Sequence, residues 1–314
     1  MTILLDGTTR VMIQGLTGGQ ARTHVRYMLD YGTRVVCGVS PGRGGASVEG
    51  VPVYDTVARA LEEHAVDLSV LFVGARWVKD AALEAVEHRV PTVLILEDGV
   101  PHHDTCEVLT RARVNDVRVI GPSAQGIVSP GRAKVGGSGG SWPERVFRAG
   151  QVGVISRSGG LGIEICLFLS RHGIGQSTYV AIGGDLMIGS GFADLLPLFE
   201  ADPQTRAVVI FGEPGSGHEE AAAAGVAEGR FSKPLIAFVA GESLEAMPGG
   251  MIFGHTSAIV GSGQGNASSK KAALKAAGVR LAERFRDLLP LVQEALAGEA
   301  RPHPRGEGVS VTEA

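Results

Sequence analysis

The segment Arg10-Val-Met-Ile-Gln14-Gly-Leu-Thr-Gly-Gly-Gln20 sets the fold of the first part of the chain. Its mostly apolar first half, Arg10–Gln14, predicts a buried strand, and the helical spacing of apolar residues over Ala21–Tyr31 predicts a helix. Gly15–Gln20 therefore joins a strand to a helix. Glycine there lets backbone N–H groups approach a phosphate, and a helix N-terminus favours an anion. Because the loop does not match G-x-G-x-x-G, a tight strand-to-helix turn is the alternative interpretation.

Strands and helices alternate in the same way through the rest of the first domain. Near-continuous apolar runs separated by helices are typical of a parallel sheet covered on both faces, which is a doubly wound α/β domain. Further strands are expected at 35–39, 68–73, 92–96 and 117–120, and further helices at 56–64, 78–88 and 105–114.

Glycine- and proline-rich stretches at 129–132 and 136–143 then interrupt the pattern, and a second alternating series follows. We expect two doubly wound α/β domains, with the first over residues 1–126, a linker at 127–150, the second over 151–297 and a flexible tail at 298–314. In the second domain, strands are expected at 152–156, 177–182, 207–212 and 235–239, and helices at 161–172, 192–200, 219–228, 268–277 and 281–296.

The composition narrows the class of protein. The 314 residues include 29 Lys and Arg against 33 Asp and Glu, a net charge of −4, so nothing indicates a general nucleic-acid surface. No apolar run reaches membrane-spanning length and Met1–Asp6 does not resemble a secretory leader, so membrane insertion and secretion are not expected. Three widely spaced cysteines fit reduced thiols in a cytoplasmic protein and predict no metal site.

The loop Ser40-Pro-Gly-Arg-Gly-Gly45 follows the second expected strand. An NAD-binding domain would carry an acidic residue there for the ribose hydroxyl. Arg43 instead offers a cation within a glycine-rich loop. This pattern argues against an NAD-dependent dehydrogenase and favours a phosphate-rich nucleotide such as coenzyme A, although a solvated surface arginine is the alternative.

The segment Ser156-Arg-Ser-Gly-Gly160-Leu-Gly-Ile-Glu164 again follows a strand and opens a helix. Ser158 has Ser156 two positions before it rather than glycine, so the segment is not a serine-hydrolase nucleophile elbow. Ser158, Gly159 and Gly160 place small residues at a helix start. They predict either an anion site or simply a serine-capped helix.

Two polar residues of the second domain lie beyond the expected strand ends, where ligands of open α/β sheets gather. Glu213 could hold a histidine in one tautomer, or be a solvated carboxylate. His255 lies in the long loop from Gly241 to Asn266, and loops of this length in compact domains are usually functional or disordered. Neutral imidazole is a competent nucleophile toward a phosphoryl group. The other eight histidines have ordinary interpretations on helices, in polar stretches or in the tail.

At this point the sequence resembles the α subunit of succinyl-CoA synthetase and related acid–CoA ligases. The resemblance extends from Ile3 to about Leu296. It is carried by Gln14–Gln20, Tyr31–Thr33, Pro41–Gly45, Ile120–Pro122, Ser156–Gly159, Gly175–Thr178, Ile182–Asp185, Asp202–Thr205, Gly212–Glu213 and Gly254–His255.

The resemblance implies a Rossmann-like CoA-binding domain followed by a flavodoxin-like ligase domain. His255 corresponds to the family's phosphorylated histidine and Glu213 to the acid that orients it, while the helix start at Ser158, Gly159 and Gly160 would bind the phosphohistidine. The implied coenzyme A contacts are Thr17, Gly18, Gly19, Gln20, Arg43, Leu96, Glu97 and Asp98.

The resemblance also implies a reaction and a partner. In the family, ATP or GTP with Mg²⁺ binds mainly to a separate β subunit of ATP-grasp fold, in a hetero-oligomer that serves the tricarboxylic acid cycle. Phosphate passes through the histidine to a small carboxylic acid, and coenzyme A then displaces it. The assembly, αβ or α₂β₂, and the choice of nucleotide stay open.

Departures from the family's pattern fall near this expected chemistry. Ser123-Ala-Gln125 replaces the usual Asn-Cys-Pro, Ile163 replaces a common tyrosine, and Thr256-Ser257 replaces Ala-Gly after the histidine. Since a hydrogen-bonding site discriminates strongly, the identity of the acid stays open, and a more apolar or differently substituted acid than succinate is a candidate. A non-catalytic CoA-binding regulatory subunit is the alternative function.

Overall fold

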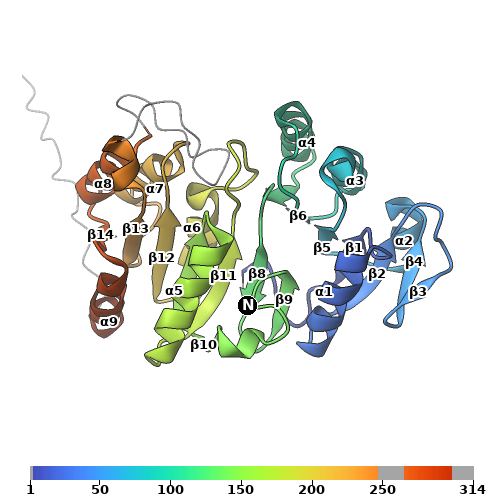
Figure 1. The fold of residues 1–314 in the computed structure, drawn as a ribbon, viewed down its shortest axis with the longest axis horizontal. Helices are drawn as coiled ribbons and strands as arrows, with labels where there is room; N and C mark the ends of the chain where they lie inside the picture. Colours follow the sequence, from blue (N-terminus) through green and yellow to red (C-terminus); the bar gives the residue numbers. More distant parts are fainter. Residues whose placement is uncertain (1–2, 247–264, 299–314) are drawn as a thin grey trace, which may run out of the picture.

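Two seven-stranded sheets stand side by side along the long axis of the molecule, each flanked by helices (Figure 1). The structure is a computed structural model that describes residues 3–246 and 265–298. The expected fold class of two α/β domains is confirmed. None of the helices within the described residues is long and apolar enough to cross a membrane.

The first sheet is built around strands whose residues are entirely buried. Its strands are β1 (Val11–Gln14), β2 (Val35–Val39), β3 (Ser47–Val48), β4 (Val51–Tyr54), β5 (Leu68–Leu71), β6 (Thr92–Ile95) and β7 (Arg118–Ile120). Its helices are α1 (Gly19–Asp30), α2 (Val57–Glu63), α3 (Ala75–Glu87) and α4 (His102–Val114). The strand order is β3-β4-β2-β1-β5-β6-β7, and every pair is parallel except β3 with β4.

The second sheet carries the other half of the chain. Its strands are β8 (Gly126–Ser129), β9 (Ala133–Gly136), β10 (Ala149–Ser156), β11 (Gln176–Ala181), β12 (Ala207–Gly212), β13 (Leu235–Val239) and β14 (Arg280–Leu281). Its α-helices are α5 (Gly159–Arg171), α6 (Phe192–Ala201), α7 (His218–Ala227), α8 (Ala267–Ala276) and α9 (Leu288–Ala297). The order is β14-β13-β12-β10-β11-β8-β9, with a parallel centre and an antiparallel edge.

The hairpin of β8 and β9 lies in the stretch for which we expected a linker. β8 pairs antiparallel with β11, so the hairpin extends the second sheet. The hairpin is also hydrogen-bonded to the first domain: Ser129 Oγ donates to the Leu5 carbonyl at 2.6 Å, and Thr33 Oγ1 donates to the Lys134 carbonyl at 2.6 Å. Residues 126–136 therefore fold between the two domains and connect them; the remaining domain limits stay predictions, and 299–314 lie outside the described residues.

The helix expected at 281–296 begins later than predicted. β14 occupies Arg280–Leu281, and the Ala282 N–H still donates to the Ala237 carbonyl at 2.9 Å. The Arg284 N–H then donates to Asp287 Oδ2 at 2.9 Å, which starts a 3₁₀ turn ahead of α9. Pairing with the sheet edge thus overrides helical spacing over the first residues.

Candidate functional site

The strand order of the first sheet reverses at β1, because the chain adds β2 and β4 on one side of β1 and β5, β6 and β7 on the other. β1 lies between β2 and β5, so the loops after β1 and β5 leave the sheet side by side, which is where α/β sheets bind ligands. Gly15 has φ +80°, and a Cβ at this position would overlap the Phe72 carbonyl oxygen. The glycine is therefore required by both backbone conformation and close approach.

Gly15→Ala should destabilise the first domain by about 2–4 kcal/mol, because the added Cβ is both strained and overlapping. Urea denaturation measures this loss. Gly19→Ala is the matched control, since a Cβ on Gly19 meets nothing within 4 Å. Equal stability of the two variants would contradict the assignment of the close approach.

A cavity of about 620 Å³ opens at this point of the sheet. It brings together Thr17, Gly18 and Arg43, three of the residues expected to contact coenzyme A. Helices α1 and α3 both begin here, with Gly18 and Gly74 as their N-cap residues, and neither helix start is capped by a side-chain hydrogen bond. Two uncapped helix N-termini and one guanidinium make this cavity suitable for an anionic, phosphate-bearing ligand.

The same cavity includes residues that sequence reasoning missed. Trp77, 53% exposed, lies on its wall together with Ser40, whose hydroxyl oxygen accepts from the Thr17 N–H at 3.2 Å. The signal available in the sequence was weak: an aromatic residue three positions after Gly74, at the start of a helix. An exposed indole beside a phosphate-binding loop offers a flat surface for a nucleotide base.

A second cavity of about 180 Å³ adjoins the first, and Phe72 lines both. It brings Gln20, Leu96 and Glu97 together with Gln125, near the junction of the two domains. Among the described residues expected to contact coenzyme A, Gly19 and Asp98 line neither cavity. The other six predicted residues thus divide between two cavities that share Phe72 as a lining residue.

The strand order of the second sheet reverses between β10 and β12. The loops after these strands carry the Ser158–Gly160 segment and Glu213, and they are tied together because the Arg157 N–H donates to the Phe211 carbonyl at 3.2 Å. Ser158 Oγ accepts from the Leu161 N–H at 3.4 Å, so the serine caps α5. The helix start and the acid therefore face the same edge, as the strand-end positions predicted.

Buried charges surround Glu213. The Glu213 side chain is largely buried, and its Oε1 lies 3.5 Å from Nε of the fully buried Arg157. The Glu213 N–H donates to Glu219 Oε1 at 3.1 Å, and Arg157 Nη2 donates to the Asp185 carbonyl at 3.2 Å. Glu213 is thus a fixed, buried acid rather than a solvated one. His255, Thr256 and Ser257 lie outside the described residues.

Gln125 connects the two halves of the site. Its side chain lines the second cavity, and a Cβ on Gly159 would come within 2.6 Å of Gln125 Cβ, so the side chain lies directly against the start of α5. The Ser123 and Ala124 N–H groups donate to the Glu97 and Ile95 carbonyls at 2.8 and 3.2 Å, which fixes this segment against β6. The expected CoA-binding pocket and the expected phosphate site therefore meet at one residue.

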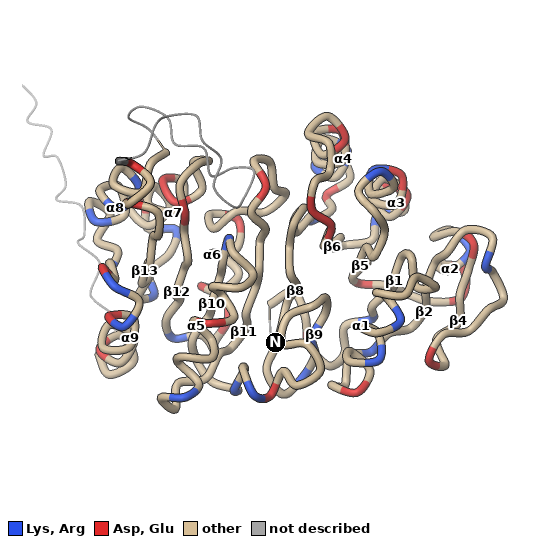
Figure 2. Tube along the Cα trace, viewed as in Figure 1, with Lys and Arg blue, Asp and Glu red and all other residues tan. Residues whose placement is uncertain are grey.

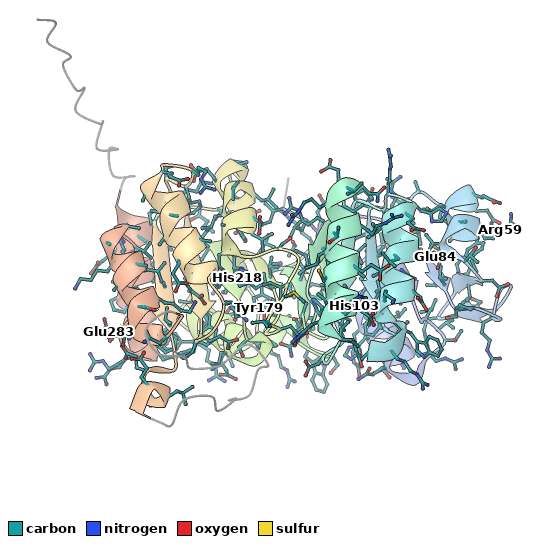
Figure 3. All side chains as sticks on the ribbon, turned by 90° about the horizontal axis from the view of Figure 1, so that it is seen from above. Arg59, Glu84, His103, Tyr179, His218 and Glu283 are labelled. Carbon is teal, nitrogen blue, oxygen red and sulfur yellow. The ribbon has the colours of Figure 1, made fainter. Side chains whose placement is uncertain are left out.

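His218 is the first residue of α7. Figure 3 shows it near Tyr179 in the view from above, between Glu283 at one end of the molecule and Arg59 at the other. Burial lowers the pKa of His218 to about 4, and the Arg157 and Lys270 cations add to this effect, while Asp194 and Glu220 oppose it. The imidazole is therefore neutral at physiological pH.

The low pKa of His218 makes stability depend on pH. Between its ordinary pKa of 6.5 and about 4, the unfolded chain binds a proton that the folded chain does not. The folding free energy that depends on the neutral His218 ring is therefore lost as the pH falls through this window, by on the order of 3 kcal/mol. Urea titrations at pH 7 and pH 4.5 should show a smaller loss for His218→Gln than for wild type; equal losses would contradict the assignment.

Comparison with known proteins agrees with this architecture. Residues 6–99 match the model of the CoA binding domain, and residues 149–295 match that of the succinyl-CoA ligase like flavodoxin domain. The chain is 44% identical over 298 residues to succinate–CoA ligase [ADP-forming] subunit alpha 1 of Archaeoglobus fulgidus, covering 94% of this chain and 99% of that protein. This chain belongs to the succinate–CoA ligase alpha-subunit family.

Proteins with other names are also similar to this chain. The ADP-forming sulfoacetate-CoA ligase subunit SqwL of an Acholeplasma species is 40% identical, over 94% of this chain and 98% of that one. Among solved structures, the ATP citrate lyase of Methanosaeta concilii in complex with citryl-CoA superposes with a TM-score of 0.86 at 26% identity. That match covers 96% of this chain and 53% of the lyase chain.

Proposed function

We propose that this chain is the catalytic α subunit of an ADP- or GDP-forming acid–CoA ligase that works through a phosphohistidine at His255. One observation carries the proposal: Gln125 lines the cavity on the CoA side and lies against the start of α5 at Gly159. A thiol bound in the first domain and a phosphoryl group bound at that helix could therefore react with one acid.

The cavities suit coenzyme A in size and chemistry. The glycine loop, Arg43 and the N-termini of α1 and α3 provide positive potential for the phosphates, and cations in such loops bind phosphate readily. The smaller cavity on the other side of the shared Phe72 is lined by Gln125, which suits the pantetheine arm with its terminal thiol. Family membership of the CoA-binding domain supports the same ligand.

The residues of the second domain suit the phosphoryl steps. The His255 imidazole would attack the γ-phosphorus and displace the nucleoside diphosphate, with Glu213 holding the ring in the reactive tautomer. The acid's carboxylate oxygen would then attack the phosphoryl group and release the imidazole. Sulfur of coenzyme A would attack the acyl phosphate carbon and expel inorganic phosphate. Main-chain N–H groups at Ser158–Gly160 would stabilise the anion.

The nucleotide with Mg²⁺ would bind mainly to an ATP-grasp β subunit in a cytoplasmic hetero-oligomer. Relatives named for succinate and for sulfoacetate support a short acid with a second anionic group. Positive and negative residues are interspersed along the described chain (Figure 2), and the net charge of the sequence is −4, which favours a small acid over a nucleic-acid partner.

The proposed function is tested with the purified chain and its β subunit. Nucleoside diphosphate release is measured with a panel of acids that includes succinate, sulfoacetate and a monocarboxylate, each with and without coenzyme A. We expect turnover that requires both the acid and coenzyme A, with an acyl-CoA product identified by mass spectrometry. Coenzyme A binding without turnover for any acid would favour the non-catalytic regulatory subunit instead.

Arg43→Ala should weaken coenzyme A binding about tenfold or more, because a charge-assisted hydrogen bond to phosphate is lost. Isothermal titration of the isolated chain measures this effect without the β subunit. Arg59→Ala is the control, since Arg59 is exposed on α2 and pairs only with its neighbour Glu62 among the described residues. Equal affinity of Arg43→Ala and wild type would remove Arg43 from the site.

A further inference from the structure

A fully buried lysine, Lys270, is linked to Glu213 through the side chain of Glu219. Lys270, on α8, has no exposed surface, and lysine is seldom buried unless its ammonium is fully paired. Its Nζ donates to the Ser216 carbonyl at 2.9 Å, to Glu220 Oε2 at 2.9 Å and, in a close ion pair, to Glu219 Oε2. All three partners belong to the segment that follows β12.

The contacts continue from Lys270 to the backbone of Glu213. Glu219 uses its second carboxylate oxygen, Oε1, to accept the Glu213 N–H at 3.1 Å. A Cβ on Gly212 would lie 2.6 Å from that same oxygen, so glycine before Glu213 leaves the space that the carboxylate occupies. One ammonium therefore fixes a carboxylate that in turn fixes the main chain of the predicted histidine-orienting acid.

The same region also holds the beginning of α8. The Gly215 N–H donates to the Gly265 carbonyl at 2.8 Å, and the helix start is capped by Asn266, whose Oδ1 accepts from the Ser269 N–H at 2.7 Å. Arg157, in the loop after β10, adds a hydrogen bond from its Nη1 to Ser216 Oγ. The loop after β12 is therefore held between α8 and the loop after β10 by buried charges.

We propose that Lys270, acting through Glu219, is a positioning residue that sets the geometry of Glu213 for phosphoryl transfer. This inference rests on the proposed function. Lys270 lines neither of the two cavities expected to bind coenzyme A, so its loss should change the rate of the phosphoryl step while leaving ligand affinities alone. A salt bridge that served stability alone would not show this separation.

A matched control lies one residue further along α8. Lys271 is also largely buried and pairs with Glu242 and Glu283 at 2.9 Å each, on contacts that do not include Glu219 or the loop after β12. Lys271→Met therefore removes a comparable set of ion pairs from the same helix. A loss of rate in Lys270→Met that Lys271→Met does not share can then be assigned to the contacts that link Lys270 to Glu213.

The test compares Lys270→Met, Glu219→Gln, their double variant and Lys271→Met in the complex with the β subunit. We expect Lys270→Met and Glu219→Gln to slow formation of acid-labile phosphate at saturating ATP by about tenfold or more, with KM for ATP and Kd for coenzyme A within about twofold. The double variant should be no slower than the slower single variant, and Lys270→Arg should recover part of the rate. Lys271→Met should keep the wild-type rate.

Hydrogen exchange on the isolated chain gives a readout that needs no phosphorylation. A peptide spanning residues 211–217 should exchange at least about tenfold faster in Lys270→Met and Glu219→Gln than in wild type or Lys271→Met. Unchanged exchange and a wild-type rate in a folded Glu219→Gln would overturn the inference, even if Lys270→Met did not fold. Faster exchange in the two variants, together with a wild-type complex that forms no phosphohistidine, would instead overturn the proposed function alone.

Discussion

His255→Asn should abolish the transfer of phosphate from ATP to this chain. Asparagine has no nucleophilic ring nitrogen, so the covalent route is closed and acyl-CoA formation should fall by at least about 10³-fold. The measurement uses γ-labelled ATP with the β subunit, followed by gel separation in alkaline and in acidic conditions. Label on wild type that is stable to alkali and lost in acid identifies a phosphohistidine.

His103→Asn is the matched control, because His103 is exposed on α4 in the other domain (Figure 3). It should carry as much label as wild type. Binding of coenzyme A by His255→Asn should also be unchanged, which separates lost chemistry from lost folding. Full labelling of His255→Asn would place the phosphoryl group on another residue and refute the proposed role.

Glu213→Gln should slow phosphorylation of the histidine by about 10²–10⁴-fold, the range over which positioned acid–base groups act. The amide keeps the shape of the buried side chain but removes the negative charge, so it cannot orient and stabilise an imidazole that becomes cationic in transfer. The loss should appear in the rate at saturating ATP, measured by rapid quenching.

Glu228→Gln provides the comparison, since Glu228 is exposed at the end of α7 and pairs with Arg230. Its rate should equal that of wild type. The main-chain contact from Glu213 to Glu219 does not use the substituted side chain and should persist, whereas loss of the ion pair with the buried Arg157 should lower thermal stability. A wild-type rate in Glu213→Gln would show that the acid has only a structural role.

The central strands could be predicted because their sequences contain the needed information. Runs such as Leu68–Leu71 and Ala207–Gly212 are predominantly apolar, and the structure buries every residue of both. The hairpins could not be predicted from the sequence. Their strands Ser47–Val48 and Ala133–Gly136 are short, and their extended conformation depends on pairing with the neighbouring strands. Apolar periodicity says nothing about such partners.

The candidate site divides in the same way. Thr17, Arg43, Ser158 and Glu213 follow strands directly, and the carboxyl edge of a parallel sheet brings such positions together whatever the detailed packing. Lys270 and Glu219 are separated by 51 residues and look like ordinary charged positions on helices. Only the burial of one helix face against another reveals that they form a pair. Trp77 is similar, since its role depends on which loop the start of α3 faces.

The hairpin of β8 and β9 bears on how this chain can be divided in the laboratory. It belongs to the second sheet through β11 and to the first domain through Leu5 and Thr33. A cut at residue 126 would remove the hydrogen bonds of Leu5 and Thr33 to the hairpin in one fragment, and a cut after residue 136 would leave the other with an open β11 edge prone to self-association. Modular exchange of either domain between relatives should therefore carry residues 126–136 and their contacts along with it.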